Sequence, residues 1–579
     1  MPLFPLAPLN EARCQRYGWL VLLLLTALLY LPGIAVLPLM DRDEPRFAHA
    51  TVEMMQRGSW AVPYFNGEYR FDKPPLTYWW MAMHYTLLGV SELSARLHTV
   101  LAVWLVALVT SSIGRRVHSA QAGLFAGAAW LLTVQVIVHG RLCVADMPLV
   151  LCVTLALRAL LEIVQEGSRG FQRWHWLFYG SLGLGFLAKG PLALLVPGVA
   201  LMLMRFAFWR KPLPWAQLRM WPGLLISVGI AAGWGVPALI ETQGLFWKVG
   251  MGEHVVERGT KAFNGRFPVP GYYLATAFLS LFPWIALLPL IVTTVRKQWS
   301  ATHALLVSWF AAPYLIFTFY ATQLPHYVMP GFPAAMLLLA LGGSFSFTAR
   351  WQRWWCVGCV GLLLIVGGIV TAVSLGFDWP QPLRPLLQHG AGFLVSLALL
   401  GGVIVWLVVT RSRLAVFGSL LAMVATAALL HLVCLDVRAI HPAVTVAQQY
   451  PALPTNTELI GWRFAEPSLV FHLDRQWRFT SKVESMEKRM LRAGPRLIIL
   501  LKREWTLSDA LQRWLGGKSM TEPTEDLTAA VDAVAARHPD YQSSTFSAFN
   551  AARSSWVELV VMARVTDDVT KLSLGQSPR

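Results

Sequence analysis

Thirteen mainly apolar runs, most of them about 20 residues long, constrain the fold of this 579-residue chain more than any other feature. A helix needs about 20 mainly apolar residues to cross the hydrocarbon core of a bilayer. The runs that approach this length are 17–37, 96–114, 119–138, 144–163, 174–188, 190–208, 221–240, 271–294, 302–321, 327–345, 354–375, 391–410 and 414–435. The chain is therefore predicted to be an α-helical polytopic membrane protein with about 13 transmembrane helices. The runs on either side of Lys189 are the least distinct pair, because only a Lys-Gly-Pro break separates them.

Composition supports this class and argues against two others. Hydrophobic residues make up 56% of the chain and charged residues only 14%, which is too apolar for a soluble globular protein. The net charge of +17 would suit a nucleic-acid-binding protein. However, Lys and Arg lie mainly in short loops between the apolar runs, where they orient helices in a bilayer. We therefore expect membrane lipids, and no nucleic acid, among the partners.

The basic residues also predict the orientation of the chain. With thirteen spans, all clusters of Lys and Arg fall on one side, which is the cytoplasmic side. The amino terminus is then cytoplasmic, and the carboxy-terminal tail lies on the outer side. The unusual polar residues gather in the outer loops, and they are Asp43, Glu44, Asp72, Lys73, Arg141, Asp146, Glu253, His254, Arg258, His326 and Tyr327. One active site can be assembled from them.

The first outer loop, residues 38–95, holds the densest charge. Three carboxylates, Asp41, Asp43 and Glu44, follow the first apolar run, and charge at a membrane edge is costly unless it has a function. We predict that Asp43 is a catalytic carboxylate, acting as a base or stabilising a sugar cation, with Glu44 beside it. The alternative is that one of these acids only caps the helix that begins at Pro45.

Other polar residues of the outer loops are candidates for binding a phosphate or completing the site. Lys73, beside Asp72, offers a compact positive charge, although a surface ion pair or a snorkelling lysine explains it equally well. Arg258 can grip phosphate oxygens in a bidentate manner, whereas a solvated loop is its ordinary explanation. Asp146, at the start of the fourth run, is either a second acid of the cavity or a helix-start residue.

Metal and cysteine chemistry has weaker support. Asp72, Glu253 and His254 could bind a divalent cation, but they lack the spacing of a metal motif. The six cysteines form no regular framework, so no essential disulfide is expected. Lone histidines are expected to be packed or interfacial, as for His84, His98 and His139. We expect no cofactor other than such a cation.

The first outer loop and the tail are predicted to have their own structure. Helical spacing after Pro45 predicts an amphipathic interfacial helix, and LTYWWMAMHYTLL after Pro75 predicts a second one. Residues 1–440 form the transmembrane domain, and alternating short runs predict a soluble α/β domain over 441–579. The expected strands are 459–464, 468–473, 496–501 and 556–565, and the expected helices are 483–492, 507–515 and 526–537.

Five elements together resemble a known group of enzymes. They are Asp-Glu-Pro-Arg at 43–46, Asp-Lys-Pro-Pro-Leu at 72–76, the turn at 141–146, the Glu-His loop ending at Arg258, and Gln-Leu-Pro-His-Tyr at 323–327. In this combination the membrane portion, roughly residues 15–440, resembles the GT-C-like polytopic glycosyltransferases that use polyprenyl-phosphate sugars. In particular, it resembles the bacterial 4-amino-4-deoxy-L-arabinose transferases that modify lipid A, which are similar to protein O-mannosyltransferases.

The resemblance implies a bacterial inner-membrane enzyme whose active site and carboxy-terminal domain are periplasmic. It implies transfer of aminoarabinose from undecaprenyl phosphate to lipid A phosphates, giving resistance to polymyxin and other cationic peptides. Asp43 matches the family's catalytic Asp, with Glu44 and Asp146 as further acids. The candidates for holding the carrier phosphate are Lys73, Arg258, Arg46 and Tyr327. One departure is Asp72, where close relatives often carry Glu.

Other functions also fit a polytopic chain with clustered charge. A polyprenyl-phosphate-sugar transferase could act on protein or on another glycan. A lipid transporter or flippase predicts paired discontinuous helices and ionisable groups near the bilayer midplane. The charges here gather on one face, which disfavours a transporter, and Arg158 within the fourth run is the exception. A structural or assembly role is the third alternative.

Overall fold

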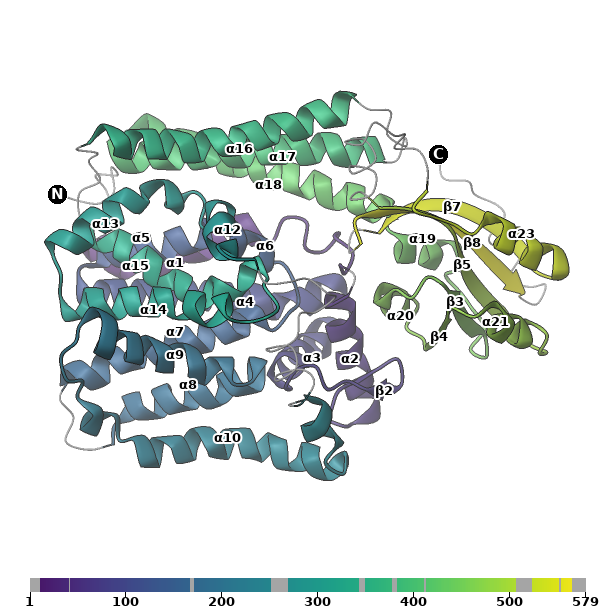
Figure 1. Cartoon of the computed structure of the whole chain (residues 1–579), viewed down its shortest axis with the longest axis horizontal. Coiled ribbons are helices and arrows are strands. Elements are labelled where there is room, and N and C mark those ends of the chain that lie inside the picture. Colours follow the sequence, from purple (N-terminus) through teal and green to yellow (C-terminus); the bar gives the residue numbers. More distant parts are fainter. Residues whose placement is uncertain are drawn as a thin grey trace.

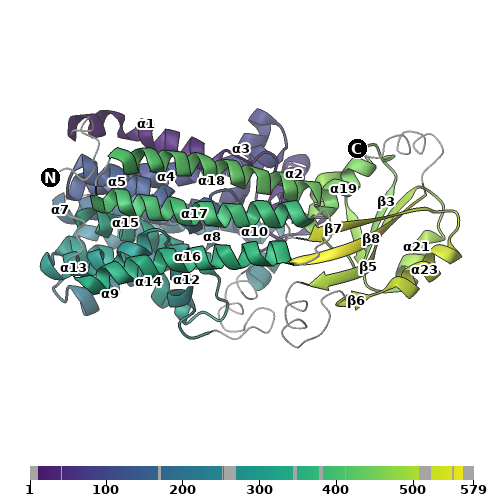
Figure 2. The ribbon, with the colours of Figure 1, turned by 90° about the horizontal axis from the view of Figure 1, so that it is seen from above.

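The computed structural model describes residues 11–40, 42–166, 171–250, 252, 269–342, 349–376, 383–410, 413–506, 523–550 and 553–564. These residues form a bundle of long helices with a mixed α/β domain at one end (Figure 1). In the bundle, the long helices run side by side along the molecule, and the sheet lies beyond their ends (Figure 2). The predicted fold class, a helical membrane protein with a carboxy-terminal α/β domain, is confirmed.

The bundle follows the apolar runs of the sequence. Its helices are α1 (Glu11–Tyr30), α4 (Glu92–Val117), α5 (Ala120–Leu131), α6 (Val134–His139), α7 (Asp146–Glu166), α8 (Arg173–Lys189), α9 (Leu192–Leu203), α10 (Met220–Glu241), α12 (Tyr272–Ser280), α13 (Leu288–Lys297), α14 (Ala301–Thr318), α15 (Phe332–Leu341), α16 (Arg350–Gly376), α17 (Arg384–Thr410) and α18 (Arg413–Ala439). Short helical turns extend or join them, namely η1 (Met204–Phe208), η2 (Trp215–Leu218), η5 (Trp284–Leu287) and η6 (Pro325–Gly331).

The predicted number of membrane spans is not confirmed. Within the described ranges, seven helices are long and apolar enough to cross a bilayer, or eight if the bent pair of α12 with the η5–α13 segment is one span. Every predicted run overlaps one helix or consecutive helical pieces, although residues 31–37 of the first run form turns after α1. However, several pieces, such as α9 and α15, are shorter than a full span. The multi-pass membrane fold is therefore confirmed, whereas the count of thirteen spans is not.

Small residues set the distance between α4 and α5. A Cβ atom on Gly123 would lie 2.2 Å from the backbone oxygen of Ser111, and one on Gly114 would lie 2.6 Å from the Cα of Gly123. No real side chain tolerates such contacts, so the two helices would have to separate. Close approach through small residues is a common way for membrane helices to associate.

We therefore expect Gly123→Ala to destabilise the bundle by about 1–3 kcal/mol, the usual cost of overpacking. Gly180→Ala is the matched control, because a Cβ atom at that helical glycine of α8 meets nothing within 4 Å. The control should be neutral or slightly stabilising, since Ala is the better helix former. Thermal unfolding of both variants in the same detergent measures the difference, and equal midpoints would contradict the argument.

Arg158, which the sequence left unexplained, lies far along α7 from Asp146. Its Nη1 donates to Glu162 Oε1 at 2.5 Å, and Arg116 Nε donates to the same oxygen at 3.1 Å. A helix rises about 1.5 Å per residue, so Arg158 is roughly 18 Å from the start of α7. It therefore belongs to an ion-pair network near the end of α4 that carries the basic residues.

Two helices and a hairpin form the first outer loop. These elements are α2 (Glu44–Arg57), β1 (Tyr64–Phe65), β2 (Glu68–Tyr69) and α3 (Leu76–Leu88). Pro45 lies in the first turn of α2, and Gly58, at φ 66°, ends it. Both segments are thus helical as predicted, and their place at the membrane interface stays a prediction. Ten of the 14 residues of α2 are buried, since α3 and a helix of the carboxy-terminal domain pack against it.

The carboxy-terminal domain is a twisted sheet with helices on both faces. Its elements are α19 (Pro442–Gln449), β3 (Glu458–Trp462), α20 (Pro467–Leu473), β4 (Trp477–Thr480), α21 (Val483–Met490), β5 (Arg496–Thr506), β6 (Glu525–Asp526), α23 (Thr528–Arg537), β7 (Gln542–Asn550) and β8 (Ser555–Arg564). The main strand order is β4-β3-β5-β8-β7, with β6 paired to β5. Strand β3 is parallel to β4 and β5, whereas β8 is antiparallel to β5 and β7.

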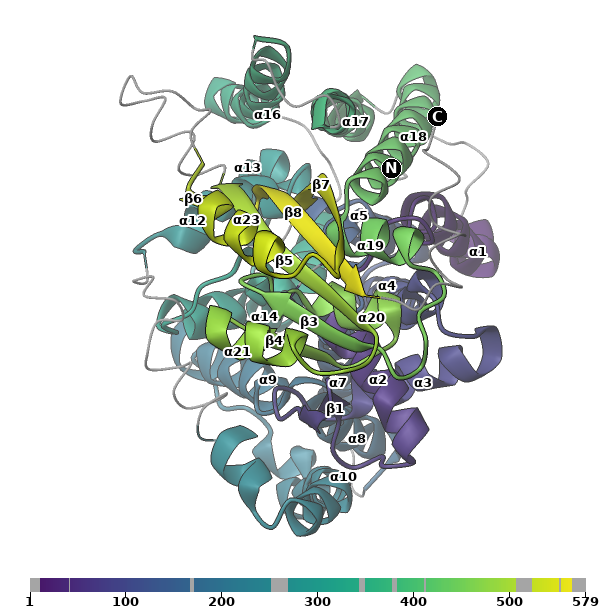
Figure 3. The same cartoon turned by 90° about the vertical axis from the view of Figure 1, so that its right-hand side faces the viewer.

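The central strand β5 explains why this domain folds. Leu497 and Ile499 face a core shared with α19 and α20, and Ile498 and Leu500 face a second core shared with α21 and α23. A strand buried on both faces reads as a continuous apolar run, which is how 496–501 was predicted. Viewed along the bundle, the domain lies in front of the helix ends (Figure 3).

One predicted strand of this domain is wrong. Residues 468–473 form helix α20, with Pro467 in its first turn. A short apolar run does not distinguish a strand from a buried helix, and the preceding proline was the better signal. The other predicted strands and the helices α21 and α23 are confirmed, β4 and β7 were not predicted, and the expected helix 507–515 lies outside the described residues.

Candidate active site

Asp43 occupies the turn that leads into α2. Its carboxylate is exposed, and none of the hydrogen bonds found within the described ranges involves it. The backbone around it is constrained, because Arg42 has a φ of 83°, a conformation that costs energy for a residue with a side chain. Asp43 does not cap α2 through its side chain. An unused carboxylate on a constrained turn is available to a ligand.

The side chain of Glu44, the next residue, is buried in the interior. Its carboxylate accepts hydrogen bonds from Arg96 Nε at 2.9 Å and from Arg96 Nη2 at 2.8 Å. It also accepts from the backbone nitrogens of Cys143, at 2.8 Å, and Met40, at 2.9 Å. Both side chains of the ion pair are almost fully buried. Glu44 therefore holds the turn in place, and its carboxylate is buried rather than exposed like that of Asp43.

Arg96, the partner of Glu44, also binds the backbone of the segment that precedes Asp43. Its guanidinium donates to the carbonyl oxygens of Ile34, at 2.9 Å, Leu37, at 2.6 Å, and Pro38, at 2.9 Å. All three nitrogens are thereby used, which is the condition under which a buried charge is tolerated. Helix α4 thus fixes the backbone on both sides of the acidic turn.

A second basic residue, Arg70, contacts residues on both sides of Lys73 in and after the Asp-Lys-Pro-Pro-Leu segment 72–76. Arg70 Nη1 lies 3.0 Å from Asp72 Oδ2, and its Nε donates to the hydroxyl of Tyr78 at 3.1 Å. Although burial opposes the charged form, Tyr78 and Asp72 raise the pKa of Arg70 above its usual value. Lys73 Nζ donates to the backbone oxygen of Asp72 at 3.0 Å. The motif therefore presents Lys73 beside an ion pair.

Arg46 lies next to these charges, in the first turn of α2. Burial lowers its pKa, and the neighbouring Arg70 adds to this effect, whereas Asp43 and Asp72 oppose it. The ordinary pKa of arginine is so high that Arg46 stays charged at neutral pH. No hydrogen bond to its guanidinium occurs among the residues with described positions. A partly desolvated guanidinium of this kind suits the binding of an anion.

A second cluster is built by four other helical elements. Asp146, the first residue of α7, lies 2.5 Å from Lys189 Nζ at the end of α8. His326 Nε2 in η6 is 3.7 Å from the same carboxylate oxygen, and its ring lies 4.3 Å from that of His139. Lys189 Nζ also lies 5.1 Å from the centre of the Tyr327 ring. Asp146 and Tyr327, predicted from separate loops, are thus brought together.

The two clusters lie at the same end of the bundle. Helix α7 starts three residues after Cys143, whose backbone nitrogen binds Glu44. Arg141 in the same turn donates to the carbonyl oxygens of Leu29 and Pro32 at the end of α1. Arg141 therefore holds the turn and is not available to a ligand.

Some predicted site residues lie outside the described ranges, namely Asp41, Glu253, His254 and Arg258. Of the suggested metal ligands only Asp72 is described, and it pairs with Arg70. Within the part of the chain that the structure describes, no group of three His, Cys, Asp or Glu side chains is arranged to hold a metal ion.

Several residues of these clusters were not predicted as site residues, among them Lys189, His139, Arg70 and Arg96. Lys189 was signalled only by its position in the Lys-Gly-Pro break, and His139 was expected to be a packed histidine. Arg70 had no local signal beyond its charge, because its partners Asp72 and Tyr78 become neighbours through the turn that precedes α3. A charge that interrupts an apolar run is the feature that sequence analysis could have used for Lys189.

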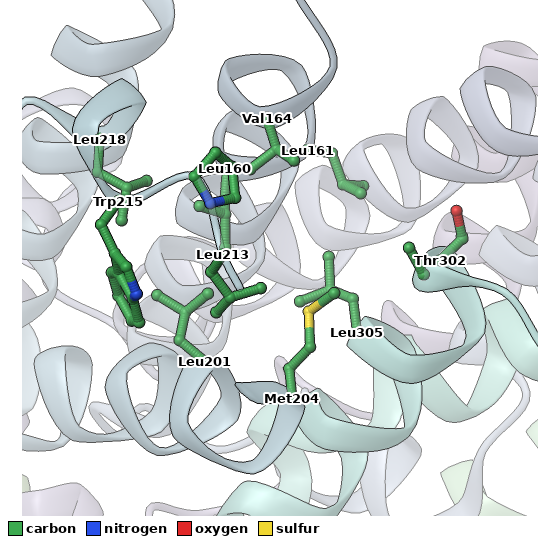
Figure 4. Close-up of a pocket in the computed structure, with 12 residues that line it drawn as sticks. Leu160, Leu161, Val164, Leu201, Met204, Leu213, Trp215, Leu218, Thr302 and Leu305 are labelled. Atoms are coloured by element: carbon green, nitrogen blue, oxygen red, sulfur yellow. The ribbon is translucent and has the colours of Figure 1, made fainter. Parts of the chain in front are cut away.

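An apolar pocket of about 100 Å³ lies elsewhere in the bundle (Figure 4). Residues from the second half of α7, from α9, from the 213–218 segment and from the start of α14 line it, and Leu160, Leu201 and Leu305 are among them. Since Asp146 lies at the opposite end of α7, this pocket is separate from the polar clusters.

The Asp146–Lys189 pair gives a testable prediction. Lys189→Met leaves a buried carboxylate with only the histidines His326 and His139 among the basic groups that act on it, so it should destabilise the protein by about 3–5 kcal/mol. The double variant Asp146→Asn with Lys189→Met should recover most of that loss, because no unpaired charge remains. Unfolding measured for both variants in detergent tests this coupling, and additive losses would contradict it. If the double variant is stable and inactive, the pair serves the reaction as well as the fold.

Comparisons with known proteins support the sequence resemblance. Residues 72–233 match the family model described as dolichyl-phosphate-mannose-protein mannosyltransferase. The chain is 29% identical over 361 residues to the undecaprenyl phosphate-α-4-amino-4-deoxy-L-arabinose arabinosyl transferase of Aeromonas salmonicida, which covers 60% of this chain and 64% of the relative. Identity to the enzyme of the same name from Edwardsiella ictaluri is 27% over 391 residues, covering 64% of this chain and 67% of that one.

The fold is similar to that of a solved relative. A crystal structure of ArnT from Cupriavidus metallidurans bound to undecaprenyl phosphate superposes with a TM-score of 0.71 at 18% identity, covering 95% of this chain and 99% of that one. The matched region spans just under two thirds of the first of the sequence relatives. The predicted resemblance to these transferases is confirmed, and so is the predicted fold.

Proposed function

We propose that this protein transfers 4-amino-4-deoxy-L-arabinose from undecaprenyl phosphate to the phosphate groups of lipid A. The observation that carries the proposal is the exposed carboxylate of Asp43, held on a constrained turn beside the partly buried Arg46. The names of the sequence relatives supply the donor class and the sugar. Transfer of the sugar would reduce the negative charge of lipid A and so weaken the binding of polymyxin and other cationic peptides.

The site suits a reaction in which one phosphate leaves and another attacks. The attacking phosphate of lipid A is already an anion at neutral pH, so it needs alignment more than deprotonation. Positive charge on Arg46 and Lys73, together with Arg258 and Tyr327, would stabilise the departing carrier phosphate. Asp43 would stabilise the positive charge that develops on the sugar, or hold the amine of the sugar. Glu44 would act only by positioning Asp43, and Asp146 stays a candidate for a second acid of the cavity.

The proposed location is the bacterial inner membrane, with both polar clusters and the carboxy-terminal domain in the periplasm. The distribution of Lys and Arg in the loops supports this orientation. The acceptor and the carrier-linked sugar would then both be lipids of the bilayer, reaching the site from its plane.

A second candidate is transfer of the sugar to a protein. The family model that matches residues 72–233 is described by a protein mannosyltransferase, which favours this alternative over other acceptors. A transporter is less well supported, because Arg158 belongs to the ion-pair network with Glu162 and Arg116, away from the polar clusters.

The test is the chemical analysis of lipid A from cells that lack their own transferase but make the carrier-linked aminoarabinose. Expression of this protein should add an aminopentose to lipid A, seen by mass spectrometry as a mass increase absent from the empty-vector cells. Unmodified lipid A at normal membrane expression would reject the lipid A acceptor. Labelled sugar found on protein in the same cells would then support the second candidate.

A further inference from the structure

One side chain of the hairpin in the first outer loop is hydrogen-bonded to the carboxy-terminal domain. Asn66, at the tip of the hairpin, donates from Nδ2 to the backbone oxygen of Trp477 at 2.8 Å. It also accepts from the backbone nitrogen of Trp477 at 2.7 Å. Trp477 begins β4, which is an edge strand of the sheet. The amide of Asn66 thus pairs with the free edge of β4 as a neighbouring strand would.

The next residue, Gly67, fits against the same segment. Its φ is 82°, and a Cβ atom there would lie 2.7 Å from Nε2 of Gln476. The backbone nitrogen of Gly67 is 3.3 and 3.2 Å from the two carboxylate oxygens of Glu53 in α2. The hairpin tip is therefore bonded to α2 on one side and to the domain on the other.

Further polar and apolar contacts join α2 to the carboxy-terminal domain. His49 Nε2 lies 3.4 Å from Glu53 Oε1, and its Nδ1 lies 3.8 Å from Asp474 of the domain. Phe65 packs against the cores of both the domain and the outer loop, and Phe471 of α20 packs against the core that contains α2. Helices α2 and α20 are in direct contact, and they lie close together in Figure 1.

The position of Asp43 depends on α2, because its own carboxylate has no hydrogen bond to any of the described residues. Helix α2 is fixed at its start by Glu44 and Arg96. Farther along the helix it is fixed by the hairpin and by α20. Glu466, just before α20, also acts electrostatically on Arg46. The domain therefore reaches Arg46 directly, and it reaches Asp43 only through the position of α2.

We propose that the hairpin 64–69 is a clamp through which the carboxy-terminal domain positions α2, and with it Asp43 and Arg46, for sugar transfer. Asn66 and Gly67 are positioning residues in this scheme, and they do not touch the substrate. The proposal rests on the proposed function for its catalytic readout, but the docking of the domain is measurable without it. A shift of about 1 Å in a catalytic group can lower a rate about 100-fold, so a modest loosening of α2 has a visible effect.

The experiment compares Asn66→Gly and Gly67→Ala with Gly58→Ala, all in the full-length protein in lipid nanodiscs. Asn66→Gly keeps the positive φ of 58° and removes only the amide bonds to Trp477. Gly58→Ala introduces the same kind of backbone strain at φ 66°, but a Cβ atom there meets nothing within 4 Å. This control shows how much of any effect comes from backbone strain alone, without loss of the contacts between the hairpin and the domain.

Hydrogen exchange of the α2 amides gives the first readout, and steady-state kinetics with carrier-linked aminoarabinose and lipid A give the second. Both clamp variants should exchange about 10-fold faster over α2 than Gly58→Ala. Their kcat should fall about 10-fold, with KM for the carrier changed less than about twofold, because only the position of the reacting groups is affected. Asn66→Asp, which still accepts from Trp477, should be intermediate in both measurements.

Two results would overturn the clamp. In the first, the clamp variants match Gly58→Ala in exchange, so that the domain does not hold α2. In the second, exchange rises but kcat is unchanged, so that the domain holds α2 without positioning the reaction. If the wild-type protein transfers no sugar at all, the proposed function fails, while the exchange data still decide whether the domain restrains α2.

Discussion

Replacing Asp43 with Asn is expected to lower the rate of sugar transfer by about 1,000-fold without unfolding the protein. The substitution keeps the shape of the side chain and removes its negative charge. Loss of a charged group that stabilises the transition state or moves a proton costs about 100- to 10,000-fold in rate. Because the Asp43 side chain is exposed and its carboxylate has no hydrogen bond among the described residues, the effect on the free energy of unfolding should stay within about 0.5 kcal/mol.

Two measurements on the same membranes check this prediction. Lipid A mass spectrometry reports the added aminopentose, and quantified membrane expression with a thermal unfolding curve reports the fold. Glu68→Gln is the matched control, because Glu68 is an exposed acid in strand β2 of the same outer loop. Glu68→Gln should retain wild-type activity. Full activity of Asp43→Asn would leave Asp43 with no role beyond its place in the turn before α2.

Much of the fold was predictable because its signals are local. The apolar runs predicted where helices lie, and the prolines at 45 and 75 marked the starts of α2 and α3. The buried strand β5 was visible as a continuous apolar run. The prediction failed for 468–473, where the same kind of run is a helix. The number of spans is not confirmed, because several helical pieces are shorter than the apolar runs that contain them.

The candidate site was less predictable, because its geometry depends on contacts between distant residues. Asp43 and Glu44 are neighbours with the same kind of side chain, yet one is exposed and the other is buried against Arg96, 52 residues away. Asp146 meets Lys189 across 43 residues, and Asn66 meets Trp477 across 411. A pattern in one segment shows that a charge needs an explanation, but only packing decides whether the charge meets a ligand or another side chain.

Replacing Arg96 with Met is expected to cause a large loss of stability, about 3–5 kcal/mol. The variant would leave the Glu44 carboxylate, which is 2% exposed, without its charged partner. It would also remove the donors to the carbonyl oxygens of Ile34, Leu37 and Pro38. Arg537→Met is the matched control, since Arg537 is 55% exposed and pairs with Glu487 at 2.7 Å. An exposed pair of this kind contributes about 1 kcal/mol or less.

The double variant Glu44→Gln with Arg96→Met separates the two effects. Without the buried charge, the free energy of unfolding, measured by denaturation in detergent, should recover by about 2 kcal/mol or more relative to Arg96→Met. Activity should not recover, because the turn before Asp43 still lacks the donors that hold its carbonyl oxygens. A double variant as unstable as Arg96→Met would show that the carbonyl contacts, and not the unpaired carboxylate, dominate the cost. A double variant with wild-type turnover would show instead that the position of Asp43 does not depend on this buried pair, and that its alignment comes mainly from the contacts of α2 with the carboxy-terminal domain.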